Sequence, residues 1–537
     1  MENGREIDRK RTGNGRKIDR KRTESTQKAD GNVQKADRKT DKKRKRSYDM
    51  KISELLKNTD MTCSENEGNI EISGVCYDSR KVASGDIFVC ISGFKSDGHV
   101  YAKSAADAGA KAVIAEHTLE DIGVPVIITN DARKALSAVS ANFFGRPSDD
   151  MLVFGVTGTN GKTTTSYLLK SIVEKSNREC AVLGTIAYVY GGQKFNSSNT
   201  TPESYELQRM FREMKEEYGT NVCAMEVSSH SLALSRVADI AFDYSLFTNL
   251  TPDHMDFHKD FEDYFAAKKK LFEITSKCSV INVDDSYGKR LADELRAEGK
   301  NVKTCAVDDD AADYRAVVID KSVSGSTVEF IAPEGSLGKL HINTPGHFSI
   351  ENAIGAAAVT LEAGIPWEYV KAGIESVKGV AGRFESVENS KGMTVIVDYA
   401  HTPDALENVL KTAREFTENK LITVFGCGGD RDRTKRPIMG KAAGELSDYC
   451  VVTSDNPRTE DPFKILEDII PGIEPTGCEF TVIEDRRRAI KQALKKYEKG
   501  DVVIIAGKGH EDYQIIGTVK QYFDDRETAL QIIEQEI

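Results

Sequence analysis

The sequence lacks the features of secreted, membrane-embedded or disulfide-linked proteins. Its ten cysteines are scattered and never form a C-x-x-C pair, so neither a zinc site nor a disulfide framework is expected. No stretch approaches the ~20 apolar residues that a membrane helix needs. The N-terminal region is charged and has no apolar segment of the kind found in secretory signals. These absences predict a protein of the reducing cytoplasm that does not insert into membranes.

The charge of the chain is divided unevenly. The formal net charge is −11, yet residues 1–48 contain 18 Lys or Arg and only 8 Asp or Glu. This segment repeats short charged stretches that cannot bury a core, so residues 1–49 are predicted to form a basic, disordered tail. The tail could bind an acidic surface or be a dispensable extension. The second interpretation is favoured, because a basic tail alone specifies no partner, and no nucleic-acid partner is expected.

Length and strand–helix alternation predict an α/β protein. A chain of 537 residues has room for about three domains of ~150 residues each. Polar, turn-rich stretches near 145–150 and 379–384 place the domains at 50–148, 149–380 and 381–537. The alternation through 151–380 is typical of a parallel sheet with crossover helices. In the last domain, short apolar runs predict buried strands at 394–398, 421–425, 449–453 and 502–506.

The clearest motif is a glycine-rich loop that follows an apolar strand. Residues 152–156 predict the strand, and G-T-N-G-K-T-T-T occupies 158–165. In such a loop, backbone N–H groups and a helix N-terminus hold phosphates, Lys162 reaches the terminal ones and Thr163 can bind Mg²⁺. The common motif has a glycine where this chain has Val156, so the loop is a shortened variant. The predicted phosphate-binding residues are Gly158, Thr159, Asn160, Gly161, Lys162, Thr163 and Thr164.

Two further polar motifs follow apolar runs in the central region. Glu226 could hold Mg²⁺ opposite the phosphate loop, since this ion prefers one or two carboxylates with phosphate oxygens. Taken alone, a solvated or helix-capping glutamate is the commoner case. Residues 248–258 contain two His, two Asp and an Asn, which favours a second metal or nucleotide site. By composition, the three lysines at 268–270 are typical of a solvated face. The chain has no Asn-Lys-x-Asp element, which argues against a GTPase switch.

Polar residues also follow the predicted strands of the last domain. Ligands of open α/β sheets bind beyond the carboxyl ends of the strands, so these residues are expected to share one crevice. Arg431, Arg458 and Glu511 would supply two guanidinium groups and a carboxylate. This set suits a ligand with both carboxylates and an ammonium, such as a free amino acid.

Together these motifs resemble those of the Mur ligases, the ATP-dependent enzymes that build the peptidoglycan stem peptide in the cytoplasm. The resemblance spans 50–537 and is carried by T-G-T-N-G-K-T-T, E-V-S-S-H, T-N-L-x-x-D-H-x-D, Y-x-x-A-K-x-x-L-F, G-R-x-E, D-Y-A-H-T-P-D-A-L, G-C-G-G-D-R-D and D-N-P-R. It implies a small N-terminal α/β domain that binds UDP, a central P-loop ATPase-like domain with a mostly parallel sheet, and a C-terminal Rossmann-like α/β domain. The implied reaction adds meso-diaminopimelate to the D-Glu carboxylate of UDP-N-acetylmuramoyl-L-alanyl-D-glutamate through an acyl phosphate, with ATP as co-substrate and two Mg²⁺ sites.

The resemblance also assigns residues to the three small-molecule substrates. For ATP it adds Asn249, Arg383 and Asp398 to the phosphate loop. For the UDP-muramoyl dipeptide it implies Ser79, Phe94, Lys95, Ser96, Asn199, Thr200, Thr201, Ser228 and Arg236. For diaminopimelate it implies Arg431, Asp455, Asn456, Pro457, Arg458, Gly507 and Glu511.

One lysine takes a new role from the resemblance. Lys268 matches a lysine that the family carries as a carbamate, N6-carboxylysine. An ammonium cannot bind Mg²⁺ but a carbamate can, so Lys268 and His254 would hold the second metal ion. The implied catalytic set is Lys162, Glu226, His254 and Lys268, and the implied metal ligands are Thr163, Glu226, His254 and carbamylated Lys268.

Arg458 is expected to select the amino acid. Diaminopimelate has a distal carboxylate that lysine lacks, and leaving Arg458 buried and unpaired would cost roughly 2–5 kcal/mol. The alternatives are a lysine-adding Mur ligase, a ligase like folylpolyglutamate synthetase, and a regulatory protein that uses ATP as a switch. Arg458 argues against the first, a UDP-type first domain against the second, and the amino-acid pocket against the third. We expect a monomer.

Overall fold

The computed structural model describes residues 49–94, 96–322 and 324–537, so residues 1–48 of the tail predicted at 1–49, together with Lys95, lie outside the described residues. Contacts within the chain define one unit up to Ala132 and a second from Arg133 to Ile537. The domain ranges 50–148, 149–380 and 381–537 stay predictions. Among the described residues, no helix is both long and apolar enough to cross a membrane.

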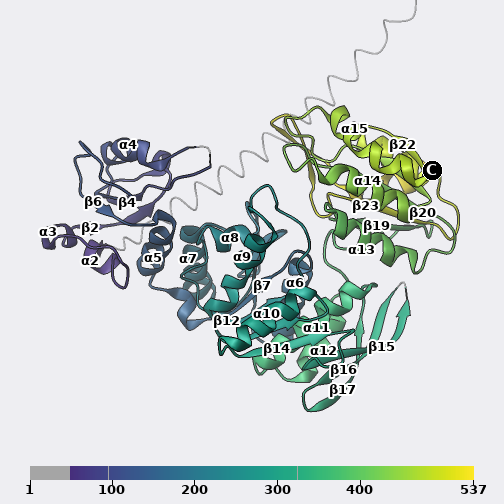
Figure 1. The fold of residues 1–537 in the computed structure, drawn as a ribbon, viewed down its shortest axis with the longest axis horizontal. Helices are drawn as coiled ribbons and strands as arrows, with labels where there is room; N and C mark the ends of the chain where they lie inside the picture. Colours follow the sequence, from purple (N-terminus) through teal and green to yellow (C-terminus); the bar gives the residue numbers. More distant parts are fainter. Residues whose placement is uncertain (1–48, 95, 323) are drawn as a thin grey trace, which may run out of the picture. The chain divides into compact units, whose positions relative to one another are not determined.

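The first unit is built around a small parallel sheet (Figure 1). Its strands run in the order β3–β4–β5–β6, at Gly74–Cys76, Asp86–Val89, Ala112–Ala115 and Val126–Ile128. Strands β4 and β5 are buried along their whole length, as expected for a sheet covered on both faces. Short elements complete the unit: β1 (Met50–Lys51) pairs with β2 (Glu71–Ile72), and the helical segments are α2 (Ile52–Leu55), α3 (Glu65–Gly68), η1 (Ser79–Lys81), η2 (Gly98–Tyr101) and α4 (Ala102–Asp107).

The second unit contains all of α5 (Ala132–Phe144) except its first residue, then η3 (Pro147–Asp150) and an eleven-stranded sheet. The strands from β8 to β15 are parallel, in the order β8–β11–β7–β12–β13–β14–β15. Their bounds are β7 Leu152–Thr157, β8 Ala181–Leu183, β11 Val222–Glu226, β12 Phe242–Phe247, β13 Thr275–Asn282, β14 Val302–Ala306 and β15 Tyr314–Ser322. The predicted central domain with a mostly parallel sheet is therefore confirmed.

Both edges of this sheet are antiparallel, which the predicted alternation did not include. On one edge β9 (Ala187–Tyr190) and β10 (Gln193–Asn196) fold back on β8, and on the other β16 (Gly325–Ala332) and β17 (Gly335–Ile342) extend β15 without intervening helices. The prediction that strands and helices alternate throughout 151–380 is wrong here. The burial of β16 instead alternates in its second half, as in a strand with one face on the core.

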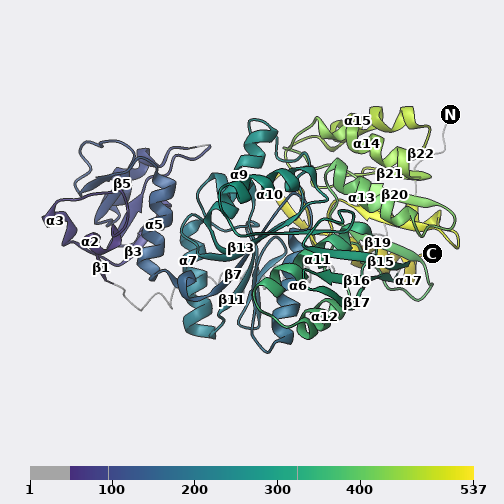
Figure 2. The ribbon, with the colours of Figure 1, turned by 60° about the horizontal axis from the view of Figure 1, so that its bottom comes forward.

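Helices cover both faces of the central sheet (Figures 1 and 2). Neighbouring residues of β7 show this, because Val153 joins one apolar core and Phe154 the other. The first core includes side chains of α7 (Ser204–Glu213), α9 (Phe261–Ile274) and α10 (Ser286–Ala297), and the second those of α6 (Lys162–Lys175), α11 (His347–Glu362) and α12 (Trp367–Ser376). The π-helical segment η4 (Met214–Tyr218) and the short α8 (Ser229–Ala233) complete this part.

A six-stranded sheet forms the rest of the second unit. Its order is β18–β19–β23–β20–β21–β22, and all neighbours except β18 and β19 are parallel. Three strands have the predicted bounds, namely β19 (Thr394–Asp398), β20 (Leu421–Phe425) and β23 (Val502–Ala506), and β21 ends one residue early (Tyr449–Val452). The other elements are β18 Glu385–Ser386, β22 Glu479–Val482, β24 Tyr513–Ile516, β25 Val519–Tyr522, α13 Pro403–Arg414, α14 Lys435–Leu446, α15 Pro462–Ile473, η5 Glu474–Thr476, α16 Arg486–Lys495 and α17 Asp525–Gln535.

Candidate functional site

The glycine-rich loop connects β7 to α6 and is held tightly by its neighbours. Gly158 and Gly161 have φ values of 150° and 87°, which favour glycine. A Cβ at Gly158 would lie 1.8 Å from the hydroxyl of Thr248, and one at Gly161 would lie 2.2 Å from the amide oxygen of Asn352. Because Gly161 also has no side chain to cap α6, the first-turn N–H groups of this helix are open to an anion.

Lys162 turns back onto its own loop. Its ammonium donates hydrogen bonds to the carbonyls of Gly158 and Thr159, both at 2.9 Å. Burial lowers the pKa of Lys162, and the nearby carboxylate of Glu226 acts in the opposite direction. The ammonium therefore lies beside the loop, where the oxygens of a bound phosphate could replace the two carbonyls as its hydrogen-bond acceptors.

Glu226 ends β11 beside the phosphate loop and is fully buried. One of its oxygens accepts hydrogen bonds from the hydroxyls of Thr163 at 3.1 Å and Thr185 at 2.9 Å. The other accepts from the backbone N–H of Thr185 at 2.9 Å. A hydroxyl and a carboxylate at the start of a phosphate-binding helix are the oxygen donors that Mg²⁺ prefers, so this pair fits such an ion.

Lys268 is buried, which contradicts its compositional interpretation as part of a solvated face. It lies in α9 with 2% of its surface exposed, and its ammonium donates to the carbonyl of Gly158 at 2.8 Å. Burial and the positive charge of Lys162 hold the pKa of Lys268 well below its usual range. A lysine whose neutral amine is favoured can react with CO₂, so the site fits the implied carbamate.

His254 lies close to this lysine on the loop after β12. Its φ of 57° is uncommon for a residue with a side chain, and its ring packs against those of His230 and Tyr264. Burial lowers the pKa of His254, which favours the neutral ring that binds metal ions. His254 and a carbamylated Lys268 together would therefore fit a second Mg²⁺ as its donors.

The phosphate loop opens into a cavity of about 610 Å³ whose other wall comes from the last sheet. Arg383 reaches across it, donating to the Thr163 hydroxyl at 3.1 Å and lying over the ring of Tyr399. Asp398 is buried and accepts backbone N–H groups from Phe384 and Ala400. The cavity is lined by every predicted ATP residue except Gly158, namely Thr159, Asn160, Gly161, Lys162, Thr163, Thr164, Asn249, Arg383 and Asp398, together with Glu226, His254 and Lys268.

Five of the predicted dipeptide-binding residues lie in the second unit near Glu226. Thr200 and Ser228 line the cavity, and the hydroxyl of Thr201 donates to the carbonyl of Glu226 at 2.8 Å. Arg236 donates to the carbonyl of Thr201 at 3.2 Å, while the carbonyl of Asn199 accepts from the Tyr188 hydroxyl. In the first unit, Ser79 begins η1, Phe94 is 77% exposed and Ser96 follows Lys95, which is not described.

The predicted amino-acid residues follow the ends of β20, β21 and β23, outside the lining of the cavity. The amide of Asn456 donates to Asp455 at 3.0 Å and to Glu511 at 2.8 Å. Arg458 donates to the carbonyl of Gly429 at 2.7 Å, and a Cβ on Gly428 would meet both Arg458 and Arg431. Gly507 leaves space for the carboxylate of Asp455, 2.5 Å from where its Cβ would be. Pro457 lies within this loop.

The structure adds cavity residues that the sequence interpretation missed. Asp404, in the first turn of α13, accepts hydrogen bonds from Asn160 at 2.7 Å and Thr251 at 3.1 Å, and so joins the last sheet to the phosphate loop. Asp284 and Asp285 follow β13, so the rule that polar residues after parallel strands mark a site could have found them. The equivalent signal for Asp404 was its place in the D-Y-A-H-T-P-D-A-L motif.

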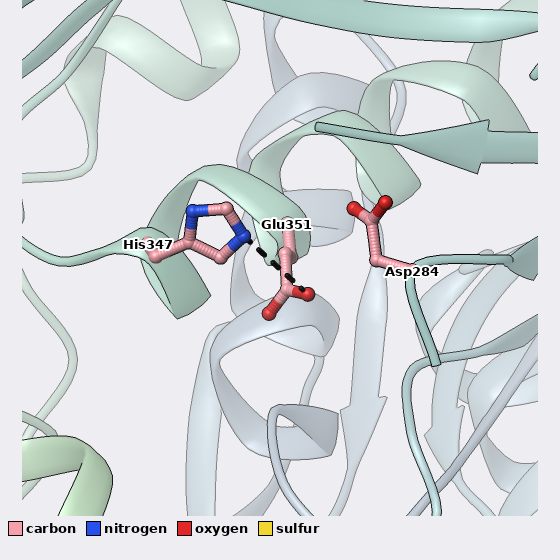
Figure 3. Close-up of side chains that lie close together, drawn as sticks. All are labelled: Asp284, His347 and Glu351. Atoms are coloured by element: carbon pink, nitrogen blue, oxygen red, sulfur yellow. Dashed lines mark ion pairs between the residues drawn. The ribbon is translucent and has the colours of Figure 1, made fainter. Parts of the chain in front are cut away.

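Three titratable side chains that line the same cavity lie close together (Figure 3). The side chains of Asp284, His347 and Glu351 offer ligand atoms within 4.8 Å of one another, and His347 lies 4.0 Å from Glu351. Asp284 is already used by the fold, because it accepts backbone N–H groups from Val307 and Asp308. Burial and the surrounding carboxylates raise the pKa of Glu351 to about 7. Two carboxyl groups, of which Glu351 keeps its proton up to about neutral pH, therefore lie at this end of the cavity.

Comparison with known families agrees with this arrangement. Three family models match: the Mur ligase family catalytic domain over 71–144, the Mur ligase middle domain over 156–360 and the Mur ligase glutamate ligase domain over 382–509. The chain belongs to the Mur ligase family. The fold class predicted from the sequence, with its three Mur ligase domains, is confirmed.

Several similar Mur ligases have specific names. UDP-N-acetylmuramoyl-L-alanyl-D-glutamate–2,6-diaminopimelate ligases from Alkaliphilus metalliredigens and Clostridioides difficile are 46% and 47% identical to this chain, covering 91% and 89% of it and 98% and 99% of their own length. A solved structure with the same enzyme name is 32% identical with a TM-score of 0.66, covering 90% of this chain and 99% of its own. The similarity therefore extends over nearly the whole length of these relatives.

Proposed function

We propose that this Mur ligase uses ATP to add meso-diaminopimelate to the D-Glu carboxylate of UDP-N-acetylmuramoyl-L-alanyl-D-glutamate. The observation that carries the proposal is the D-N-P-R loop, where the Asn456 amide donates to Glu511 and the guanidinium of Arg458 lies beside Arg431 and donates to the carbonyl of Gly429. Two guanidinium groups and carboxylates suit an amino acid with a second carboxylate. The names of the relatives support the same substrate.

The phosphate-loop residues would promote phosphoryl transfer from ATP to the D-Glu carboxylate. The reaction brings two anions together, so its barrier falls when their charge is neutralised. Lys162 and the open N–H groups of α6 would bind the phosphates, and Arg383 would approach them from the last sheet. Thr163 and Glu226 would hold one Mg²⁺, and His254 with carbamylated Lys268 a second. Bound there, the ions would supply positive charge to the phosphate oxygens.

The amino-acid residues would then position the attacking amine. Its neutral nitrogen attacks the acyl phosphate, and the tetrahedral intermediate collapses to the amide with release of inorganic phosphate and an amine proton; ADP is the product of the preceding phosphoryl transfer. Asp455 and Glu511 provide carboxylates for an ammonium, and Arg458 provides the partner of the distal carboxylate. Positioning and charge account for this chemistry, so no protein nucleophile is required. We further propose that the enzyme acts in the cytoplasm as a monomer, with the residue roles and domain bounds predicted from the sequence.

The test is ADP release from the full chain with Mg²⁺, ATP and the UDP-dipeptide, comparing meso-diaminopimelate with L-lysine. Turnover with diaminopimelate alone is expected. Turnover with lysine alone would identify the lysine-adding version, and no turnover with either would point to a ligase like folylpolyglutamate synthetase. ATP binding without ADP release in the full mixture would favour a nucleotide-gated regulatory protein.

The role of Arg458 has a matched control in the same assay. Arg458→Ala should lower kcat/KM for diaminopimelate by about 10²-fold or more, because the distal carboxylate of the bound substrate would lose its guanidinium partner. Arg433 is an exposed arginine that pairs with Asp468 in the same domain, and Arg433→Ala should change kcat/KM less than about twofold. Equal losses in the two variants would remove Arg458 as the selecting residue.

A further inference from the structure

The β24–β25 hairpin lies along the D-N-P-R loop and is hydrogen-bonded to it at several residues. The backbone N–H of Arg458 donates to the carbonyl of Ile515 at 3.1 Å, and the N–H of Gly517 donates to the carbonyl of Arg458 at 2.7 Å. The N–H of Ile515 donates to the side-chain oxygen of Asn456 at 2.8 Å. First-strand and turn residues of the hairpin thus bind two neighbouring parts of the loop.

The loop needs such support because its backbone is unusual. Arg458 has a φ of 50°, a left-handed conformation that is costly for a residue with a side chain unless the surroundings hold it. Its two backbone hydrogen bonds to the hairpin form an isolated parallel bridge with Ile516. The direction in which Arg458 presents its guanidinium therefore depends on contact with the hairpin.

Gln514 makes the side-chain contact of the hairpin with the start of this loop. Its amide nitrogen donates to the carbonyl of Asp455 at 2.6 Å, one residue before Asn456. The residue is half-buried on β24 and pairs directly with Gln521 of β25, which is exposed. Unlike the backbone contacts, the Gln514 contact can be removed by substitution without changing the path of the hairpin.

We propose that Gln514 is a positioning residue that fixes the D-N-P-R loop for recognition of the amino-acid substrate. This inference rests on the proposed function, in which Arg458 binds the distal carboxylate of diaminopimelate. Gln514 acts through the loop backbone and does not itself touch the substrate. Its loss should therefore weaken binding of the amino acid and leave the ATP and UDP-dipeptide sites, which lie on other elements, unchanged.

The test compares Gln514→Met, which keeps the side-chain length and removes the donor, with Gln521→Met across the hairpin. Losing one hydrogen bond and loosening the loop should raise KM for diaminopimelate about tenfold in Gln514→Met, with KM for ATP and kcat within about twofold. Gln521→Met should match the wild type. An unchanged KM for diaminopimelate, or equal rises in KM for all three substrates, would overturn the proposal.

Hydrogen–deuterium exchange separates this proposal from the proposed function. In Gln514→Met, peptides covering 455–459 should exchange at least about fivefold faster than in the wild type, whereas Gln521→Met should show no change. This readout applies even if the wild type turns over neither amino acid, an outcome that would overturn only the proposed function. Unchanged exchange would overturn the positioning role. Gln514→Glu is the second variant, and loss of tertiary structure in both would show a purely structural role and also overturn the proposal.

Discussion

A guanidinium nitrogen of Arg383 donates to the hydroxyl of Thr163 at 3.1 Å, although 220 residues separate them in the chain. The contact places a positive charge from beside the last sheet at the first turn of the phosphate-binding helix. The same hydroxyl donates to Glu226, so three groups of the proposed ATP site meet at one atom. Arg383 therefore lies beside the loop that we propose binds the phosphates of ATP.

Replacing Arg383 should weaken ATP use selectively. A hydrogen bond to a charged group contributes about 1.5–3 kcal/mol, so Arg383→Ala should raise KM for ATP by about 10- to 100-fold. KM for diaminopimelate should remain within about twofold. Steady-state ADP release measures both, with Arg433→Ala as the exposed control. An equal rise in the two KM values would contradict a role limited to ATP.

Lys268 should carry a carbamate when CO₂ is present. Its depressed pKa favours the neutral amine that reacts with CO₂. In ¹³C-bicarbonate, the wild type should show a carbamate ¹³C signal that is missing in Lys268→Ala, and this variant should lose about 10²-fold or more in kcat. Lys270 is exposed on the same helix, so Lys270→Ala should keep both signal and activity. A persistent signal in Lys268→Ala would place the modification elsewhere.

Glu351 should make the protein less stable as pH rises. Its folded-state pKa is about 7 against an ordinary value of 4.5, with Asp284, Asp285 and Asp308 near it. The folded state therefore binds more protons between these values, and stability falls as pH increases through that window. Glu351→Gln should gain in unfolding free energy relative to the wild type from pH 5 to pH 8, by at most about 3 kcal/mol. The ring of His347 also faces the carboxyl of Glu351.

Urea denaturation at both pH values measures the effect of Glu351→Gln. Glu368, exposed on α12, provides the matched control, because Glu368→Gln should give the same difference from the wild type at pH 5 and pH 8. A pH-independent difference for Glu351→Gln would show that its carboxyl does not titrate in this range.

The ion pair of Arg486 and Asp525 should be sensitive to loss of one partner. Both side chains are fully buried, and Arg486 also donates to the carbonyls of Ala506 and Ser454 at the ends of β23 and β21. Arg486→Met would leave the carboxylate of Asp525 buried without its partner and should cost about 3–5 kcal/mol of unfolding free energy. The double variant Arg486→Met/Asp525→Leu should recover much of this loss.

Arg487, the next residue, allows a direct comparison. It pairs with Glu536 on the surface, so Arg487→Met should cost less than about 1 kcal/mol in the same urea experiment. If Arg486→Met proved no more destabilising than Arg487→Met, the buried pair would not be supporting the ends of these strands.

The last sheet was predictable because its strands are short apolar runs that end in polar residues. β19, β20 and β23 begin and end where the sequence predicted. The antiparallel edge formed by β15, β16 and β17 was not predicted. The sequences of these half-buried strands do not differ visibly from those of the strands that alternate with helices elsewhere in the domain. Local sequence patterns predict the burial of a strand better than they predict whether the next strand is parallel or antiparallel to it.

Lys268 shows why part of the site could not be derived from composition. A run of three lysines is typical of a solvated helix face. The helical spacing of buried Tyr264, Lys268 and Leu271 nevertheless puts the first lysine on the apolar side. Family resemblance gave its implied role. The neighbouring carboxyl side chains of Asp284 and Glu351 were not predicted as a cluster. Asp284 follows a strand and Glu351 lies in a helix far from it in the sequence.

The tight fit around Gly158 and Gly161 has an evolutionary consequence. Atoms of Thr248 and Asn352 already occupy the space that a methyl group would need at these positions. Substitutions of the polar side chains in this loop could change how the loop binds a nucleotide. Replacing Gly158 by alanine would first require a change at Thr248, directly after β12, and replacing Gly161 a change at Asn352 of α11, so divergence at this loop depends on two distant segments of the gene.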